Sequence, residues 1–328
     1  MEFFRGVNVN WLGWKWYFLA FSMIFSVAGI TKMTLNWFHS DPNHRTPVPL
    51  SVDFRGGTEI EVRFAQPPDL DAIRKAIYAV GIRDARIQNY YNLQHPENHE
   101  VLIGLPEETN EAALDVGRTQ VESALQTHYN QFNPATVVKV EVVGPTVGEQ
   151  LKKKAVEATL FSLLGMLVYL WFRFQLIYGV AAVVACFHDT LITVGAFALW
   201  NREISLTVIA AILTLVGYSM NDTIVVFDRI RENLRLSRRE PLADLVNRSI
   251  NQTLSRTVLT SGLTFLTVLS LFVFGGQVLH DFSFALVVGI LIGTYSSIAV
   301  AAPMLVAWQE WRAGQGKAAS LPAARKAR

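Results

Sequence analysis

Six long apolar segments alternate with polar stretches along the chain. They cover residues 14–37, 155–172, 176–199, 205–227, 257–275 and 282–307. A helix needs about 20 predominantly apolar residues to cross a bilayer, so each segment predicts a transmembrane helix. The first segment is longer than the core of a signal peptide, and no small-residue cleavage site follows it, which indicates a retained helix.

The polar stretch 38–154 has the pattern of one small folded domain. Residues 58–64 alternate between apolar and polar, as a half-buried strand does. The rest of the stretch predicts a helix at 69–80, strands at 85–91 and 101–105, a helix at 111–129 and a strand at 135–143. This β-α-β-β-α-β order is that of the ferredoxin-like motif. The expected fold class is therefore an α-helical polytopic membrane protein of six transmembrane helices with an inserted α+β ferredoxin-like external domain.

The segment that connects the fourth and fifth spans is charged but keeps apolar residues at helical spacing. Its first part continues the fourth span, and Pro241 starts an amphipathic helix that we expect along the membrane face. The predicted organisation is an N-terminal segment with the first span (1–37), the external domain (38–154), spans two to four (155–227), a cytoplasmic connection (228–254), spans five and six (255–308) and a basic, disordered tail (309–328).

Composition and charge agree with a membrane protein and predict its orientation. The chain is 51% hydrophobic and 17% charged, which is too apolar for an ordinary soluble domain. Seven arginines lie within 228–256, whereas the loop at 200–204 has only Arg202 and the loop at 275–281 has no Lys or Arg. The positive-inside rule then places both termini in the cytoplasm and residues 38–154 outside, periplasmic in a Gram-negative cell.

Several kinds of chemistry are disfavoured. Cys186 is the only cysteine, so neither a disulfide framework nor a thiol metal site is available. His95 and His99 fall in or beside a predicted hairpin loop, where two histidines alone are too few ligands to indicate a metal. No Walker A loop, dinucleotide fingerprint, H-E-x-x-H or nucleophile elbow is found. We therefore predict no enzyme, cofactor, metal or nucleic-acid site, and any work must draw on an ion gradient or a partner.

Asp222 is the most informative polar position because it lies inside the fourth apolar segment. A carboxylate at such a depth costs on the order of 2.5–3.5 kcal/mol, so it predicts a proton relay, an ion path or a buried ion pair. Asn221, Gly217 and Ser219 lie beside it or one turn earlier, and they predict the close approach of a neighbouring helix and hydrogen-bond partners between the helices. The alternative is a purely structural polar contact between helices.

Two further polar groups lie in apolar segments. His188 and Asp189 are near the middle of the third span, where they predict either a proton relay or a static hydrogen-bonded pair between helices. Arg256 begins the fifth span and is followed at helical spacing by a polar stripe of Thr257, Thr260, Ser261, Thr264 and Thr267.

We expect Asp222 and Arg256 to face one another across the fourth and fifth spans. Protonation of Asp222 would then switch the pair between a salt bridge and a neutral arrangement. The alternative is that Arg256 marks the cytosolic boundary or binds a lipid phosphate.

Motifs spread over nearly the whole chain resemble the SecF branch of the SecD/SecF family, which belongs to the resistance-nodulation-division superfamily. The matching pieces are Asp53-Phe54-Arg55-Gly56-Gly57-Thr58, Val143-Gly144-Pro145-Thr146-Val147-Gly148, His188-Asp189, the run from Gly217 to Asn233, Ser255-Arg256-Thr257 and Thr260-Ser261-Gly262. Met220 departs from the pattern, since a small aliphatic residue is more usual there.

The resemblance implies a function and a set of partners. It implies that the chain works with SecD in the cell inner membrane and uses the proton motive force to complete Sec-dependent translocation of preproteins that the SecA motor has pushed forward. It also implies association with the SecYEG channel and, in many bacteria, YajC, together with membrane lipids. Asp222 and Arg256 match the family's proton-path acid and its basic counterpart.

Two other functions stay open. One is half of a small-molecule or lipid exporter of the same superfamily, although the external domain of about a hundred residues is near the smallest common domain size. The other is a passive scaffold for SecD and the channel. The high cost of burying Asp222 argues against pure scaffolding.

Overall fold

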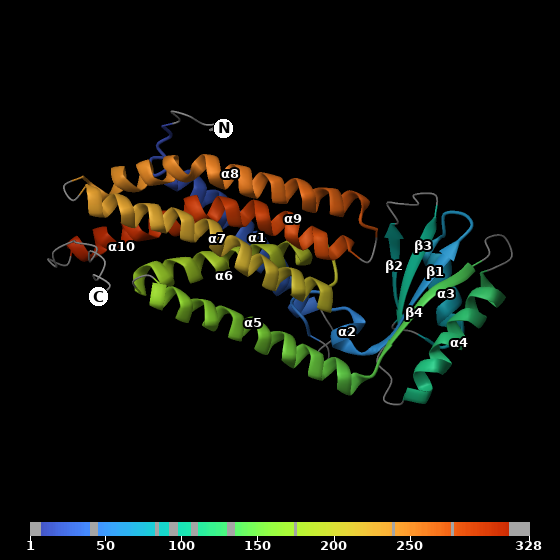
Figure 1. Ribbon diagram of the computed structural model, residues 1–328. Coiled ribbons are helices and arrows are strands. Elements are labelled where there is room, and N and C mark those ends of the chain that lie inside the picture. Colours follow the sequence, from blue (N-terminus) through green and yellow to red (C-terminus); the bar gives the residue numbers. More distant parts are fainter. Residues whose placement is uncertain are drawn as a thin grey trace.

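The computed structural model describes residues 8–39, 45–82, 85–91, 98–105, 111–129, 135–173, 176–237, 240–276 and 279–314. A long helical bundle carries a small domain with a β-sheet at one end (Figure 1). Within these residues, the helices long and apolar enough to cross a membrane are Lys15–His39, Thr146–Arg173, Ile177–Leu199, Leu206–Leu236, Leu242–Phe274 and His280–Trp308. The predicted six-span fold is confirmed.

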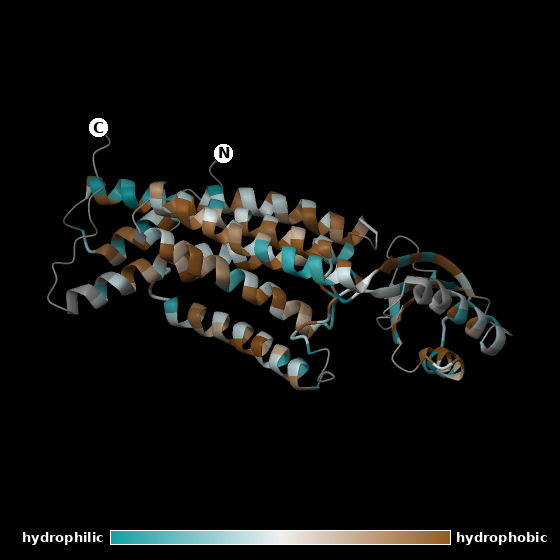
Figure 2. Ribbon diagram, turned by 90° about the horizontal axis from the view of Figure 1, so that it is seen from below, coloured by the Kyte–Doolittle hydropathy of each residue, from teal (hydrophilic) through white to brown (hydrophobic). Residues whose placement is uncertain are grey.

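The bundle has central and peripheral helices. Its elements are α1 (Lys15–His39), α5 (Pro145–Arg173), α6 (Leu176–Leu199), α7 (Leu206–Leu236), α8 (Leu242–Phe274), α9 (His280–Ser296), the π-helical turn η1 (Ser297–Ala301) and α10 (Ala302–Gly314). Each span has a most apolar stretch, and about half of the residues in that stretch are buried within the bundle in α6, α7 and the last span. The buried share is only 17% in α8, 11% in α1 and 6% in α5. Hydrophobic residues dominate the bundle, and hydrophilic ones gather toward the helix ends (Figure 2).

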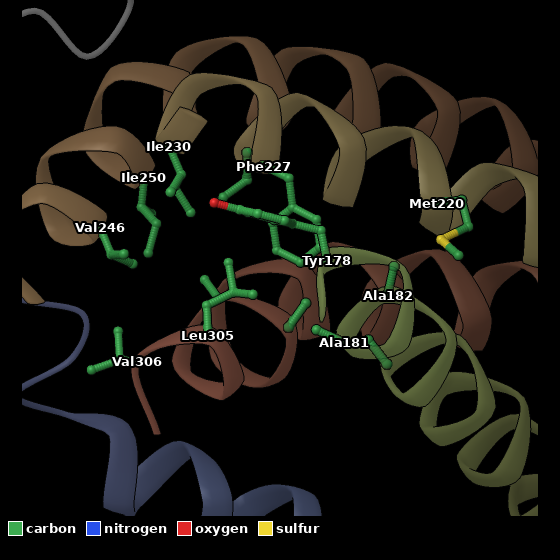
Figure 3. Close-up of a cluster of buried hydrophobic side chains, with 14 of the residues drawn as sticks. Tyr178, Ala181, Ala182, Met220, Phe227, Ile230, Val246, Ile250, Leu305 and Val306 are labelled. Carbon is green, nitrogen blue, oxygen red and sulfur yellow. The ribbon is translucent and has the colours of Figure 1, made fainter. Parts of the chain in front are cut away.

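Two apolar clusters hold the bundle together. One joins α6, α7, α8 and α10 at the end away from the sheet, where Tyr178 packs edge-to-face on Phe227 at 5.3 Å between ring centroids (Figure 3). The other lies nearer the sheet and includes Phe197, Leu215 and Ile290. Phe54, which precedes the sheet, packs into this second cluster and so anchors the external domain on the bundle.

The external domain has the predicted ferredoxin-like order. After the short helix α2 (Val52–Arg55) come β1 (Gly57–Phe64), α3 (Leu70–Ala79), β2 (Arg86–Tyr91), β3 (His99–Leu105), α4 (Glu111–His128) and β4 (Ala135–Val143). The strands form an antiparallel sheet in the order β2-β3-β1-β4. His99 is the first residue of β3, whereas His95 lies outside the described residues.

The prediction of a separate amphipathic helix along the membrane face is wrong. Residues 242–254 and the fifth span form one continuous helix, α8, of 33 residues. The chain has no Pro or Gly between Pro241 and Gly262 to break the helix. Leu245, Val246 and Ile250 pack into the first cluster, so the apolar face of this segment covers the bundle rather than lipid.

Two other boundaries differ from the sequence interpretation. Helix α5 begins at Pro145, ten residues before the predicted second span, since proline fits the first turn of a helix. The last span continues as helix to Gly314, so the tail from 309 is not wholly disordered; residues 315–328 lie outside the described part.

Candidate functional site

Asp222 lies in the interior of the bundle. It is 3% exposed on α7, and its Oδ2 accepts a hydrogen bond of 2.6 Å from the Oγ of Ser261 on α8. Ser261 is 4% exposed. Thr257, one turn earlier on the same face of α8, is also buried, and its hydroxyl has no hydrogen-bond partner among the described residues. A buried acid and two hydroxyls therefore meet between α7 and α8.

Arg256 does not form the expected salt bridge. No ion pair joins it to Asp222 among the described residues, and its side chain is exposed. Arg256 and Ser261 point in different directions because five residues turn a helix by about 140° beyond one full turn. The direct partner of the acid is Ser261.

The polar stripe on α8 has two edges with different surroundings. Thr257 and Ser261 face the bundle, whereas Thr260 and Thr267 are exposed and Thr264 is half-buried. The three outer hydroxyls donate to the carbonyl four residues earlier in their own helix, at 2.9–3.0 Å. Only the inner edge of the stripe contributes to the Asp222 site.

Gly217 and Asn221 lie on the outer side of α7. Both are exposed, and a Cβ added at Gly217 would meet nothing within 4 Å. Among the described residues, no helix of this chain approaches Gly217 closely, so a neighbouring helix there stays a prediction. The close approach occurs on another face, where a Cβ on Gly293 of α9 would lie 3.0 Å from that of Ser219. Glycines in the last span could have suggested this contact from the sequence.

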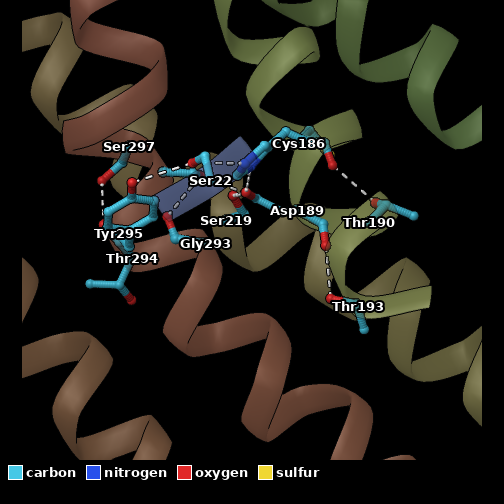
Figure 4. A network of polar contacts seen from close by, with 12 residues as sticks. Ser22, Cys186, Asp189, Thr190, Thr193, Ser219, Gly293, Thr294, Tyr295 and Ser297 are labelled. Atoms are coloured by element: carbon cyan, nitrogen blue, oxygen red, sulfur yellow. Dashed lines mark hydrogen bonds and ion pairs between the residues drawn. The ribbon is translucent and has the colours of Figure 1, made fainter. Parts of the chain in front are cut away.

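Asp189 is the centre of a second buried polar site (Figure 4). It is 1% exposed, and its Oδ2 accepts hydrogen bonds from Ser219 of α7 at 2.6 Å and Ser296 of α9 at 2.8 Å. Its Oδ1 lies 3.0 Å from Nδ1 of His188. The predicted pair is thus extended by two serines, one of which, Ser219, was expected to aid packing and offer a hydrogen bond near Asp222 but bonds to Asp189 instead.

The network continues to α1. The Nε2 of His188 lies 3.1 Å from the Oγ of Ser22, which is 3.3 Å from the hydroxyl of Tyr295. Tyr295 in turn donates to the carbonyl of Phe18. With a proton on Nδ1, His188 donates to Asp189 and accepts from Ser22. Sequence reasoning missed Ser22, Tyr295 and Ser296, although polar residues inside apolar spans were the available signal.

The external-domain motif lies at the junction between the sheet and the bundle. The carboxylate of Asp53 accepts the backbone N–H of Leu206 at 2.9 Å and so caps the start of α7. Gly56 and Gly57 have φ of 74° and 110°, which favour glycine. A Cβ on Gly148 of α5 would lie 2.9 Å from the nitrogen of Gly56. Thr58 is fully buried at the start of β1.

Charged residues also connect the domain to the loop between α6 and α7. Arg86 of β2 pairs with Glu203 of that loop, and backbone bonds join Ser51 and Pro49 to Ile204. Burial, and then the negative charges of Glu203, Glu141 and Asp53, together raise the pKa of Glu59 on β1 to about 8. The domain is therefore held against the bundle at an electrostatically crowded junction.

Comparison with known proteins identifies the family. The profile described as "Protein export membrane protein SecD/SecF, C-terminal" matches residues 121–311, and "SecD/SecF GG Motif" matches residues 46–68. A protein translocase subunit SecF from Koribacter versatilis is 53% identical, with 97% of this chain and 96% of the relative covered. The chain belongs to the SecF family. The SecF of Calditerrivibrio nitroreducens is 45% identical over 78% of this chain and 83% of its own length.

The solved structures support the same assignment. The crystal structure of SecDF from Thermus thermophilus, titled a translocon-associated membrane protein, matches with a TM-score of 0.80 and 38% identity over 93% of this chain. This SecF-family chain corresponds to 39% of that longer SecDF chain. A second structure, of SecDF in a super-membrane-facing form, matches with a TM-score of 0.66. The chain is therefore a multi-pass inner-membrane subunit of protein translocase.

Proposed function

We propose that this SecF-family chain works with SecD to complete Sec-dependent protein translocation at the expense of the proton motive force, with Asp222 as the group that takes up and releases the proton. The observation that carries the proposal is the isolation of the Asp222 carboxylate. It is buried, and the one hydrogen bond recorded for its side chain comes from Ser261 on a different helix. A proton that arrives there changes the bond between α7 and α8.

The chemistry follows from which groups can donate. The ionised carboxylate is an acceptor only, so Ser261 donates to it. A protonated carboxyl gains an O–H donor and keeps only a weaker, uncharged acceptor, so the charge-assisted bond from Ser261 is weakened or exchanged. The unpartnered hydroxyl of Thr257 is a fitting alternative partner one turn away. Arg256, five residues before Ser261 on α8, is the basic group that we assign to the same proton path.

SecD is the partner that fits the outer side of this site. Next to exposed leucines of α8 such as Leu263, the exposed residues near this site include polar or small ones: Thr214, Gly217 and Asn221 of α7 and Arg256 and Thr260 of α8. Lipid tails offer no partners for such groups, so in a membrane we expect another protein to cover them. The Thermus SecDF relative carries a matching region within a single longer chain. SecYEG, YajC and SecA-driven preproteins belong to the same proposal as partners of the assembled complex.

The proposed orientation has both termini in the cytoplasm and the external domain in the periplasm. The adjoining ends of α7 and α8, which carry Arg229, Arg231, Arg235 and Arg248, lie at the end of the bundle opposite the sheet (Figure 1), which supports this orientation by the positive-inside rule. Asp222 is then reached by protons from the periplasmic side and releases them toward the cytoplasm.

The test measures export of a secreted reporter into inverted membrane vesicles that hold the SecD complex, with the proton gradient present and then collapsed. Asp222→Asn should lose the gradient-dependent part of export and keep the ATP-driven part, with SecD association verified by pull-down. Asp244→Asn makes the same chemical change at an exposed position of α8 and should match wild type in both states.

Other results point to the other functions. Gradient-dependent export that survives Asp222→Asn would favour a passive scaffold. Normal export combined with altered drug sensitivity would favour an exporter.

A further inference from the structure

The segment before α1 lies across the half of α8 that is distant from the sheet, and two asparagines hold it there. Asn251 pairs with the backbone of Val9 in both directions: its Oδ1 accepts from the nitrogen at 3.2 Å, and its Nδ2 donates to the carbonyl at 2.9 Å. The same Oδ1 accepts from the indole of Trp11 at 3.0 Å. Asn251 therefore binds this segment as a neighbouring strand would.

Asn247 lies one turn earlier on the same face and completes the contact. Its Oδ1 accepts from the backbone nitrogen of Leu12 at 3.0 Å, and its Nδ2 donates to the side chain of Asn10 at 2.8 Å. Leu12 is 8% exposed and packs into the first apolar cluster. Five hydrogen bonds thus join α8 to residues more than 230 positions away in the sequence.

We propose that Asn247 and Asn251 are positioning residues that clamp the inner half of α8, residues 242–255, to the segment before α1. A change of the hydrogen bond at Asp222 then moves the outer half of α8, residues 256–274. The proposal rests on the function proposed above. We name this contact between Asn247, Asn251 and residues 9–12 the asparagine clamp.

The two halves of α8 are held very differently. On its other side the inner half is bound to α7, where Asn233 donates to Ser249 and Gln252 at 2.8 Å each. In residues 256–274, the bond from Ser261 to Asp222 is the one side-chain hydrogen bond to another helix among the described residues. A Cβ added at Gly262, directly after Ser261, would meet nothing within 4 Å. Apolar packing, with Val268 in the second cluster, also holds the outer half, but this packing is non-directional, so the single hydrogen bond is the polar contact whose change can shift the outer half about a fixed inner half.

The clamp connects α8 to a rigid frame. Helix α1 packs on α6 so closely that a Cβ on Gly29 would lie 2.9 Å from the Cα of Gly195. Ser22 adds the contact to His188 described above. Helix α1 is thus fixed to the central helices, and residues 45–56 beyond it lead to the external domain.

The test replaces the contacting pair by cysteines, Asn10→Cys with Asn247→Cys, in a Cys186→Ala background that removes the natural thiol. Gradient-dependent export is measured in inverted vesicles with the SecD complex, first reduced and then after oxidation to a disulfide. We expect export about fivefold lower in the reduced state, the change that a lost hydrogen bond of about 1 kcal/mol gives. Oxidation to the disulfide should restore gradient-dependent export, because the clamp acts only by keeping residues 9–12 on α8.

Two outcomes would overturn the clamp. Wild-type export in the reduced state would mean that the contact is not needed. Failure of the disulfide to restore export, with SecD association intact, would mean that the segment must leave α8. Asn251→Ala, without cysteines, should show the same loss as the reduced pair. Asp222→Asn is measured in parallel. If Asp222→Asn keeps gradient-dependent export, the proposed function fails. If Asp222→Asn loses it and the clamp variants keep it, only the clamp is refuted.

Discussion

Two buried carboxylates on neighbouring helices are equally hidden from solvent but differ in their partners. Asp189 is 1% exposed and has hydrogen bonds to His188, Ser219 and Ser296, which tie α6 to α7 and α9. Asp222 is 3% exposed and has one, to Ser261 of α8. Burial of either carboxylate costs free energy, so burial does not distinguish the two. The number of hydrogen-bond partners does: several partners fix Asp189 in one arrangement, whereas a single partner allows Asp222 to change its arrangement.

The difference has a chemical basis. A proton on Asp189 would weaken several charge-assisted hydrogen bonds at once, those with His188, Ser219 and Ser296, because a neutral carboxyl is a weaker acceptor. At Asp222 a single serine hydroxyl, which can donate or accept, is the only group that must adjust. We therefore expect the Asp189 site to hold the frame and the Asp222 site to switch.

Removal of each carboxyl should have unequal effects on stability. Asp189→Ala deletes three hydrogen bonds, and at roughly 0.6–1 kcal/mol each it should lower the free energy of unfolding by about 2–3 kcal/mol. Asp222→Ala deletes one and should cost about 1 kcal/mol or less. Thermal unfolding of the two variants in detergent checks this, and equal losses would remove the distinction between the sites.

Glu59 is a half-buried carboxyl outside the membrane, and its effect on stability depends on pH. Burial and the charges of Glu203, Glu141 and Asp53 raise its pKa to about 8, so its neutral form stabilises the fold. That stability is fully present below about pH 4.5 and is lost as pH rises through 8, by about 1–2 kcal/mol between pH 6 and 8.

Melting curves from pH 5 to 9 measure this loss. Glu59→Gln should reduce the loss of stability that accompanies rising pH. The same change at the exposed Glu149 should leave the pH dependence of stability unchanged. A wild-type stability that rises over this range would contradict the assignment.

The smallest effects on stability are expected from removing the hydroxyls of Ser261 and Ser296. These two variants should differ in export rather than in stability. Ser296→Ala and Ser261→Ala each remove one donor to a buried carboxylate, at about 1 kcal/mol or less. Ser261→Ala should also alter the dependence of export on the proton gradient, whereas Ser296→Ala should not. A loss of coupling in both variants, or in Ser296→Ala alone, would show that Asp189 takes part in the switch.

Much of this architecture could be predicted from the sequence. Apolar runs located the six spans, and alternation between 58 and 143 located the sheet and its helices. The intramembrane position of Asp222 and of His188 with Asp189 was visible for the same reason: an ionisable residue is conspicuous where almost every neighbour is apolar.

The partners of these groups could not be read in the same way. Spacing alone placed Arg256 and Ser261 on one polar helix, but the rotation of α8 decides that the serine rather than the arginine touches Asp222. The continuity of α8 was missed because Arg256 suggested a membrane boundary. A long arginine side chain can instead reach toward the interface from within a helix. Ser22, Tyr295 and Ser296 meet Asp189 only through packing of segments far apart in the chain.

The measurement closest to the central claim is difference infrared spectroscopy of the SecD complex in membranes, which follows the carbonyl stretch of protonated carboxyl groups as pH is varied. We predict a band that titrates in the wild type, vanishes in Asp222→Asn and persists in Asp189→Asn. A titrating band that survives in Asp222→Asn and disappears in Asp189→Asn would contradict the account and assign the proton to the other carboxylate.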